Sequence, residues 1–107
     1  MSEVKTQPVE ATHVPDKEQF RTNEFEGRIP GSFRVTEADT DGEQTFWYCC
    51  PCGCGSLGPL TVGNGFKPKS TPSWHWSGST DKPTLKPSVH HVGHWHGWLT
   101  DGVWRSV

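Results

Sequence analysis

The sequence is short of the aliphatic residues that normally fill a protein core. Only 19 of the 107 residues are Ile, Leu, Val or Phe, which is below the share typical of a globular domain. No apolar run in the sequence approaches the ~20 residues of a membrane-spanning helix, so we expect no membrane association. The length leaves room for one small domain. A core this poor in aliphatic residues usually needs a disulfide or a metal to stabilise it.

Basic residues are also scarce. Residues 46–107 carry five bases and two acids, and the bases are scattered among Pro and Gly rather than gathered into a stripe. This pattern argues against a nucleic-acid partner. The first residues contain no apolar stretch typical of a signal peptide, so we expect a cytoplasmic protein. Thiols stay reduced in that compartment.

The two halves of the chain differ in composition. Residues 1–45 hold ten of the twelve acids and contain neither Cys nor Trp. We expect residues 1–30 to form a flexible acidic N-terminal segment and residues 31–107 to form a zinc-binding β domain. Within the segment, Asp16 is a possible N-cap for a short helix over residues 17–21.

From residue 31 onward, short apolar runs alternate with Gly and Pro, a pattern typical of small β architecture. The runs predict strands at 32–36, 45–48, 60–62, 73–77, 84–89, 95–99 and 103–106. Asp101 and Gly102 lie between the last two runs and predict a tight hairpin, because both residues tolerate positive φ. Large aromatic side chains would supply most of the core. The expected core tryptophans are Trp74, Trp76, Trp95, Trp98 and Trp104.

All four cysteines lie within six residues, in the run Cys49-Cys50-Pro51-Cys52-Gly53-Cys54. A disulfide between residues so close would be strained and would stabilise little. Thiolates on a tight turn can instead converge on one tetrahedral Zn²⁺. A redox Cys-x-x-Cys site would be expected at the start of a helix, which the glycines disfavour. A Rieske iron–sulfur centre would need a histidine one or two residues after Cys52. The sequence has Gly and Cys at these positions, which excludes this alternative.

Five of the six histidines fall between His75 and His96. On a strand, His94 and His96 would project from the same face. Ligands from one tight turn cover only one side of an ion, so we expect donors from this second segment to complete the site. His75, His90 and His91 are expected to be ordinary surface or core residues. The candidate zinc ligands are therefore Cys50, Cys52, Cys54, His94 and His96, and the sequence does not choose four among them.

Four segments carry a family resemblance: Cys50–Gly55, Pro72–Trp76, Pro83–Val89 and His94–Trp104. They contain a Cys-Pro-Cys-Gly-Cys turn, a Pro-Thr-Leu-x-Pro-Ser strand and a His-rich hairpin. In these features the chain resembles a family of small phage and prophage zinc-binding proteins without an established activity, some of which carry the label ammonia monooxygenase. The resemblance spans about residues 45–107. It implies zinc binding, and it implies the host cytoplasm as the location if the gene is a phage's.

The sequence thus predicts a mainly β, small zinc-stapled domain that resembles a zinc ribbon, with a flexible N-terminal segment. A catalytic zinc needs an acidic general base nearby, and only Asp81 and Asp101 follow residue 45. We therefore expect a structural zinc, no catalytic residue and no enzymatic activity. The expected function is that of a phage or prophage interaction module that binds a host or phage protein.

Two alternatives stay open. The first is a small metal-dependent enzyme, either a hydrolase or a copper or zinc oxidoreductase. Its copper version rests on the similarity of His94-Trp95-His96-Gly97 to a copper-ligand box of multicopper oxidases. The second is a nucleic-acid accessory module, which would fail if the protein did not bind DNA or RNA.

Overall fold

The structure is a computed structural model that describes residues 5–21 and 28–107. Its described residues form nine short strands and one helix, so the prediction of a mainly β protein is confirmed. The predicted strands and the helix lie where the sequence placed them, although β4, β5 and β7 extend further than predicted. The elements are β1 (Val9–Glu10), β2 (Thr12–His13), α1 (Lys17–Arg21), β3 (Ser32–Val35), β4 (Glu43–Cys49), β5 (Leu57–Asn64), β6 (Trp74–Trp76), β7 (Leu85–His91), β8 (Trp95–Thr100) and β9 (Val103–Ser106).

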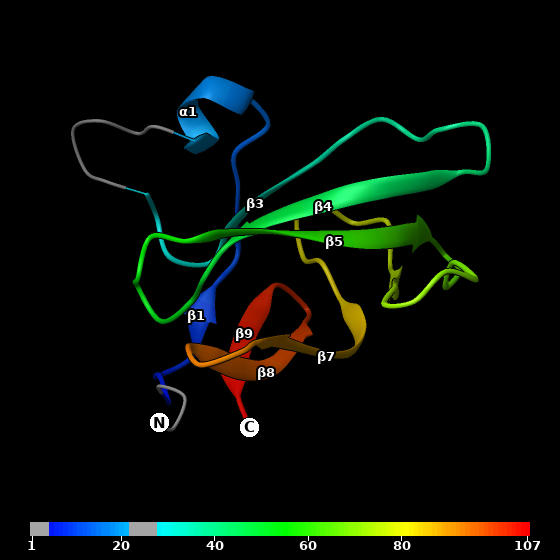
Figure 1. Cartoon of the computed structure of the whole chain (residues 1–107). Helices are drawn as coiled ribbons and strands as arrows, with labels where there is room; N and C mark the ends of the chain where they lie inside the picture. Colours follow the sequence, from blue (N-terminus) through cyan, green and yellow to red (C-terminus); the bar gives the residue numbers. More distant parts are fainter. Residues whose placement is uncertain (1–4, 22–27) are drawn as a thin grey trace.

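All of these strands belong to one sheet, in the order β1-β9-β8-β7-β6-β5-β4-β3-β2. Only Ala11 separates β1 from β2, yet the two strands lie at opposite ends of this order. β1 pairs antiparallel with β9, and β2 pairs parallel with β3. Residues 9–13 therefore bring both edges of the sheet together, and the sheet curls into a nearly closed barrel (Figure 1). Such closure leaves few unpaired backbone groups at the edges.

The N-terminal residues take part in this closure, which the sequence did not indicate. The backbone N–H of Ala11 donates to the carbonyl of Gly102 over 2.8 Å. The N–H of Thr6 donates to Oγ of Ser106 over 2.8 Å, and Nε1–H of Trp95 donates to Oγ1 of Thr6 over 3.1 Å. These contacts are hydrogen bonds rather than apolar packing, so they leave no apolar periodicity to read in the sequence. Within the segment predicted to be flexible, residues 1–4 and 22–27 lie outside the described residues.

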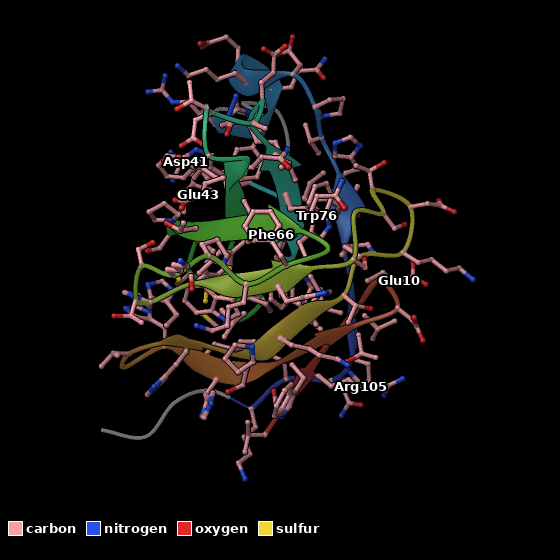
Figure 2. The ribbon with its side chains drawn as sticks, turned by 90° about the vertical axis from the view of Figure 1, so that its right-hand side faces the viewer. Glu10, Asp41, Glu43, Phe66, Trp76 and Arg105 are labelled. Carbon is pink, nitrogen blue, oxygen red and sulfur yellow. The ribbon has the colours of Figure 1, made fainter. Side chains whose placement is uncertain are left out.

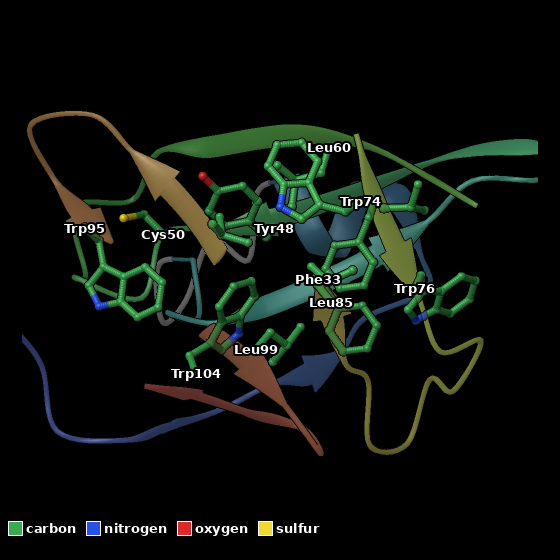
Figure 3. Packing of buried hydrophobic residues seen from close by; sticks show 13 residues of the cluster. Phe33, Tyr48, Cys50, Leu60, Trp74, Trp76, Leu85, Trp95, Leu99 and Trp104 are labelled. Carbon is green, nitrogen blue, oxygen red and sulfur yellow. The ribbon is translucent and has the colours of Figure 1, made fainter. Parts of the chain in front are cut away.

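Aromatic side chains fill the interior of the barrel (Figure 3). Phe46 and Tyr48 point inward from β4, whereas Trp47 between them is only half-buried. Of the tryptophans expected in the core, Trp98 differs, because its side chain is 46% exposed. Alternate residues of β8 face inward, and Trp98 lies on the outer side with His96. The buried tryptophans are Trp74, Trp76, Trp95 and Trp104.

The last two strands form the hairpin that the sequence predicted. Thr100 pairs with Val103 across the turn. Asp101 and Gly102 occupy the turn with φ angles of 48° and 79°, the left-handed conformation that these residue types tolerate. The outer surface of the barrel carries charged side chains, among them Glu10, Asp41 and Arg105 (Figure 2). The described part of the chain contains no helix of the length and apolarity needed to cross a membrane.

Candidate functional site

The cysteines follow from the end of β4 into the turn that leads to β5. Cys49 and Cys50 are buried, Cys52 is half-buried and Cys54 is exposed, and all four are free thiols. The Sγ atoms of Cys50 and Cys52 lie 3.2 Å apart. Gly53 and Gly55 adopt φ angles of 87° and 81°, a backbone conformation that glycine adopts at little cost. The turn therefore gathers three sulfur atoms at its tip.

The turn between β7 and β8 lies against this cysteine turn. The ligand atoms of Cys50, Cys54 and His91 lie within 4.8 Å of one another, and so do those of Cys52, Cys54 and His94. The rings of His91 and His94 stack with their centroids 4.5 Å apart. Two segments about forty residues apart in the sequence thus converge on one cluster. The cluster could hold a metal ion.

The pKa values of Cys54 and His91 favour the forms that bind metals, whereas that of Cys50 does not. Burial alone would raise the pKa of Cys54, but hydrogen bonds from the backbone and side chain of Ser56 and from the thiols of Cys52 and Cys50 lower it to about 7. Burial raises the pKa of the Cys50 thiol, which a bound cation would oppose. Burial, and then the charge of His94, lower the pKa of His91. A neutral imidazole and a thiolate are the forms that bind metals.

His91 was not among the predicted ligands, but its surroundings make it a candidate. Its Nδ1 atom is buried and has no hydrogen-bond partner among the described residues. An unpaired buried nitrogen is costly, and a bound metal would satisfy it. Cys49 lies outside both ligand groups, and burial raises its pKa to about 11. Of the two predicted histidine ligands, His94 belongs to one of these ligand groups and His96 belongs to neither.

His96 instead faces a serine. Its Nε2 atom lies 3.1 Å from Oγ of Ser88, within hydrogen-bond distance. Ser88 is on β7 and His96 is on β8, and both side chains are half-buried. The neighbouring residues Val89 and Gly97 are register partners, so the pairing of the two strands sets this contact. A serine hydroxyl beside a histidine nitrogen is the arrangement of a nucleophile and its general base.

An irregularity in β7 positions Ser88. Between the pairs Leu85–Leu99 and Val89–Gly97, β7 has three residues where β8 has only one. Such bulges redirect side chains and occur often beside active sites. The Nε1–H of Trp74 donates to the carbonyl oxygen of Ser88 over 3.1 Å. The serine is therefore held on a bend of the strand that an inner tryptophan supports.

A second histidine lies against His96. The rings of His90 and His96 stack with their centroids 4.5 Å apart and an angle of 28° between their planes. The two residues are register partners on β7 and β8. Among the described residues, the ring of His90 packs on His96, whereas a catalytic triad would have a carboxylate beside its histidine. Stacking restricts the rotation of the imidazole, as the third member of a catalytic triad does by hydrogen bonding.

The structure thus shows a small β protein in which a serine hydroxyl and a histidine nitrogen lie within hydrogen-bond distance on neighbouring strands. The family comparison is more specific. Residues 17–107 match the family model described as "Bacterial ubiquitination-like system serine protease (BubE)". Because the match covers most of the chain, the chain belongs to the BubE family. No curated protein and no solved structure gives a significant match.

The family corrects two predictions made from the sequence. The chain was expected to be a phage or prophage interaction module without enzymatic activity, and this is wrong because the family is named for a serine protease of a bacterial system. The alternative of a metal-dependent hydrolase or oxidoreductase is a different kind of enzyme. The sequence prediction missed Ser88 because the chain has no Gly-x-Ser-x-Gly motif around it. Its histidine partner becomes a neighbour only when β7 and β8 pair.

Proposed function

We propose that this chain is a serine protease in which Ser88 is the nucleophile and His96 is the general base. The observation that carries the proposal is the 3.1 Å contact between Oγ of Ser88 and Nε2 of His96. Both side chains are accessible in part, so a substrate carbonyl can reach the hydroxyl. The family name supports the same class of reaction.

The two side chains can carry both halves of a hydrolysis. As Oγ of Ser88 attacks the substrate carbonyl, its proton passes to Nε2 of His96. The protonated His96 then donates this proton to the departing amine, and the acyl group stays on Ser88 as an ester. In the second half, His96 takes a proton from water, the water oxygen attacks the ester, and Ser88 regains its proton as the acid leaves.

The surroundings of the pair would keep its geometry during this cycle. The ring of His90 packs on the imidazole of His96, and Trp74 holds the backbone at Ser88. Gly97 follows His96 and is closely surrounded, since a Cβ atom there would clash with the carbonyl oxygen of Arg105. Rigid placement of nucleophile and base lowers the entropic cost of the reaction. The family name suggests a substrate within a ubiquitination-like system, and we propose a protein of such a system.

Active-site labelling tests this proposal without knowledge of the substrate. A fluorophosphonate should modify the full-length protein once, and peptide mass spectrometry should place the adduct on Ser88. Ser88→Ala should abolish labelling, and His96→Ala should slow it by about a hundredfold or more, the usual contribution of a general base. Ser70→Ala is the matched control, because Ser70 is an exposed loop residue and its variant should label normally.

Two outcomes would overturn the assignment. One is an adduct on another serine, and the other is labelling of Ser88 that proceeds at the same rate in His96→Ala. Circular dichroism spectra and urea unfolding of each variant should be compared with those of the parent chain, so that a loss of fold is not read as a loss of the nucleophile.

We also propose that the cysteine and hairpin turns hold one Zn²⁺. The proposed ligands are Cys50, Cys52, Cys54 and one of the two stacked histidines, His91 and His94. Thiolate and imidazole donors suit zinc better than they suit calcium or magnesium. Four protein ligands leave no open position for water, so this zinc would crosslink the two turns and would not catalyse the reaction. The hairpin that it anchors carries both Ser88 and His96.

Zinc content separates the two sites. Protein purified without added metal should contain close to one zinc per chain, and Cys54→Ser should lose it. His96→Ala should keep zinc while labelling slows, whereas the sequence-based ligand set predicts that this variant loses zinc. His75→Ala on β6 is the control and should change neither property. A metal-free parent protein, or a Cys54→Ser variant with full zinc content, would contradict the zinc site and leave the Ser88 assignment unaffected.

A further inference from the structure

A cavity of about 450 Å³ lies between α1 and the outer face of the sheet formed by β3, β4 and β5. Arg34 on β3 and Trp47 on β4 are register partners on this face. Their neighbours along the strands, Phe33 and Phe46, point into the barrel and are fully buried. Because successive side chains of a strand point to opposite faces, Arg34 and Trp47 lie on the outer side of the sheet, where α1 covers them. The size lies within the range of small-molecule sites.

Among the described residues that line it, the cavity carries three positive charges and no acid. Lys17 and Arg21 reach it from α1, and Arg34 reaches it from β3. Among the described residues, Arg21 forms an ion pair with Glu18, but the two atoms are 3.9 Å apart and both side chains are exposed. An exposed pair of this kind contributes little. Lys17 and Arg34 have no ion pair within the part of the chain that the structure describes.

Arg34 also leaves a hydrogen-bond donor unused. Its Nε atom is buried and has no partner among the described residues. Nearly all buried donors in proteins are satisfied, and an unpaired one costs free energy. A guanidinium presents its N–H groups in a fork that matches the oxygen atoms of a phosphate or a carboxylate. An anionic oxygen inside the cavity would satisfy this donor and balance the charge.

The remaining walls are mostly apolar. They consist of the ring of Phe20 from α1, the indole of Trp47 from β4, the side chain of Leu57 from β5, and Thr36, which follows β3. Aromatic walls favour a planar apolar group, which they can cover on its face. A ligand that fits both features joins a flat ring to an anionic group.

We propose that this cavity binds a small anion in which a phosphate or a carboxylate is attached to an aromatic or heterocyclic ring. Arg34, Lys17 and Arg21 hold the anionic group, and Trp47 and Phe20 hold the ring. α1 lies at the opposite end of the molecule from β7 and β8 (Figure 1). The site is therefore separate from Ser88 and His96, and its existence does not depend on the proposed protease activity.

Nuclear magnetic resonance titration of the full chain tests the proposal. The probes are phenyl phosphate and phenylacetate, and the signal is the indole N–H of Trp47, assigned with Trp47→Phe. At millimolar concentrations, one or both probes should shift this signal to saturation. Comparison of the two affinities shows whether the site prefers a phosphate or a carboxylate. Benzyl alcohol, which has the ring without the charge, and inorganic phosphate, which has the charge without the ring, should each bind at least about tenfold more weakly.

Arg34→Gln should weaken binding of the charged probe by about tenfold or more. Lys17→Gln, at an exposed position that does not endanger the fold, should weaken it to a smaller extent. Lys69→Gln is the control, because Lys69 is an exposed loop residue outside the cavity. The proposal is refuted if neither charged probe shifts Trp47 saturably, if benzyl alcohol binds as well as the anions, or if both charge variants bind like the control.

Discussion

Replacement of Thr6 by Val tests whether the N-terminal residues are an integral part of the barrel. Trp95 is fully buried, and its Nε1–H donates to Oγ1 of Thr6 over 3.1 Å. Valine keeps the branched shape of threonine but has no acceptor. The backbone N–H of Thr6, which donates to Oγ of Ser106, is unaffected by the change. The variant therefore removes two contacts of Oγ1: the hydrogen bond from Trp95, 89 positions away, and the 3.2 Å contact with Oγ of Ser106.

The expected cost follows from the burial of Trp95. A buried donor that loses its acceptor costs about 1–3 kcal/mol, more than the net gain from an ordinary hydrogen bond. We expect Thr6→Val to lower the free energy of unfolding by an amount in this range. For a domain of about this size, each kcal/mol corresponds to a fall of roughly 4–8 °C in Tm. A flexible tail would give no measurable change.

Urea unfolding of the parent chain, the two single variants Thr6→Val and Trp95→Phe, and the double variant measures the interaction between Thr6 and Trp95 directly. In the Trp95→Phe background the donor is absent, so Thr6→Val should cost less there than in the parent chain, and the remaining cost is that of the lost contact with Ser106. Thr12→Val, which changes an exposed threonine on β2, is the matched control and should be close to neutral. The reasoning fails if Thr6→Val has no effect in the parent chain, or if it costs the same amount in both backgrounds.

Three further predictions concern packing, pH and the metal. Gly97→Ala should destabilise the protein by several kcal/mol in urea unfolding, because the new Cβ would clash with the carbonyl oxygen of Arg105. Burial lowers the pKa of His13 below 6.5 in the folded protein. As the pH falls, the imidazole is therefore protonated in the unfolded chain before it is protonated in the folded protein. The free energy of unfolding should fall as the pH drops from 6.5 towards the folded pKa. His13→Gln should remove part of that loss in a series of melting curves. Removal of zinc by a strong chelator should lower the free energy of unfolding by up to about 4 kcal/mol, the entropic value of closing a loop of ~40 residues. An unchanged urea midpoint after zinc loss would contradict the proposed zinc crosslink between the two turns.

Local patterns in the sequence predicted much of the sheet. Short aromatic-rich runs marked β8 and β9, and Asp101 with Gly102 marked the turn between them, because these features depend only on neighbouring residues. The two-residue strands β1 and β2 left no such pattern. Their backbone hydrogen bonds to β9 and β3 make little demand on side-chain type.

The sequence by itself determined that this is a mainly β chain with a dense group of thiols and imidazoles. Only the tertiary structure decided how these residues divide between two sites. His91 and His94 lie at the turn between β7 and β8 and face the cysteines. His96 lies further along β8, opposite the bulge that directs Ser88 towards it. Composition and spacing could not separate these histidines, because strand register and the bulge in β7 set their partners, and both depend on contacts between different parts of the chain.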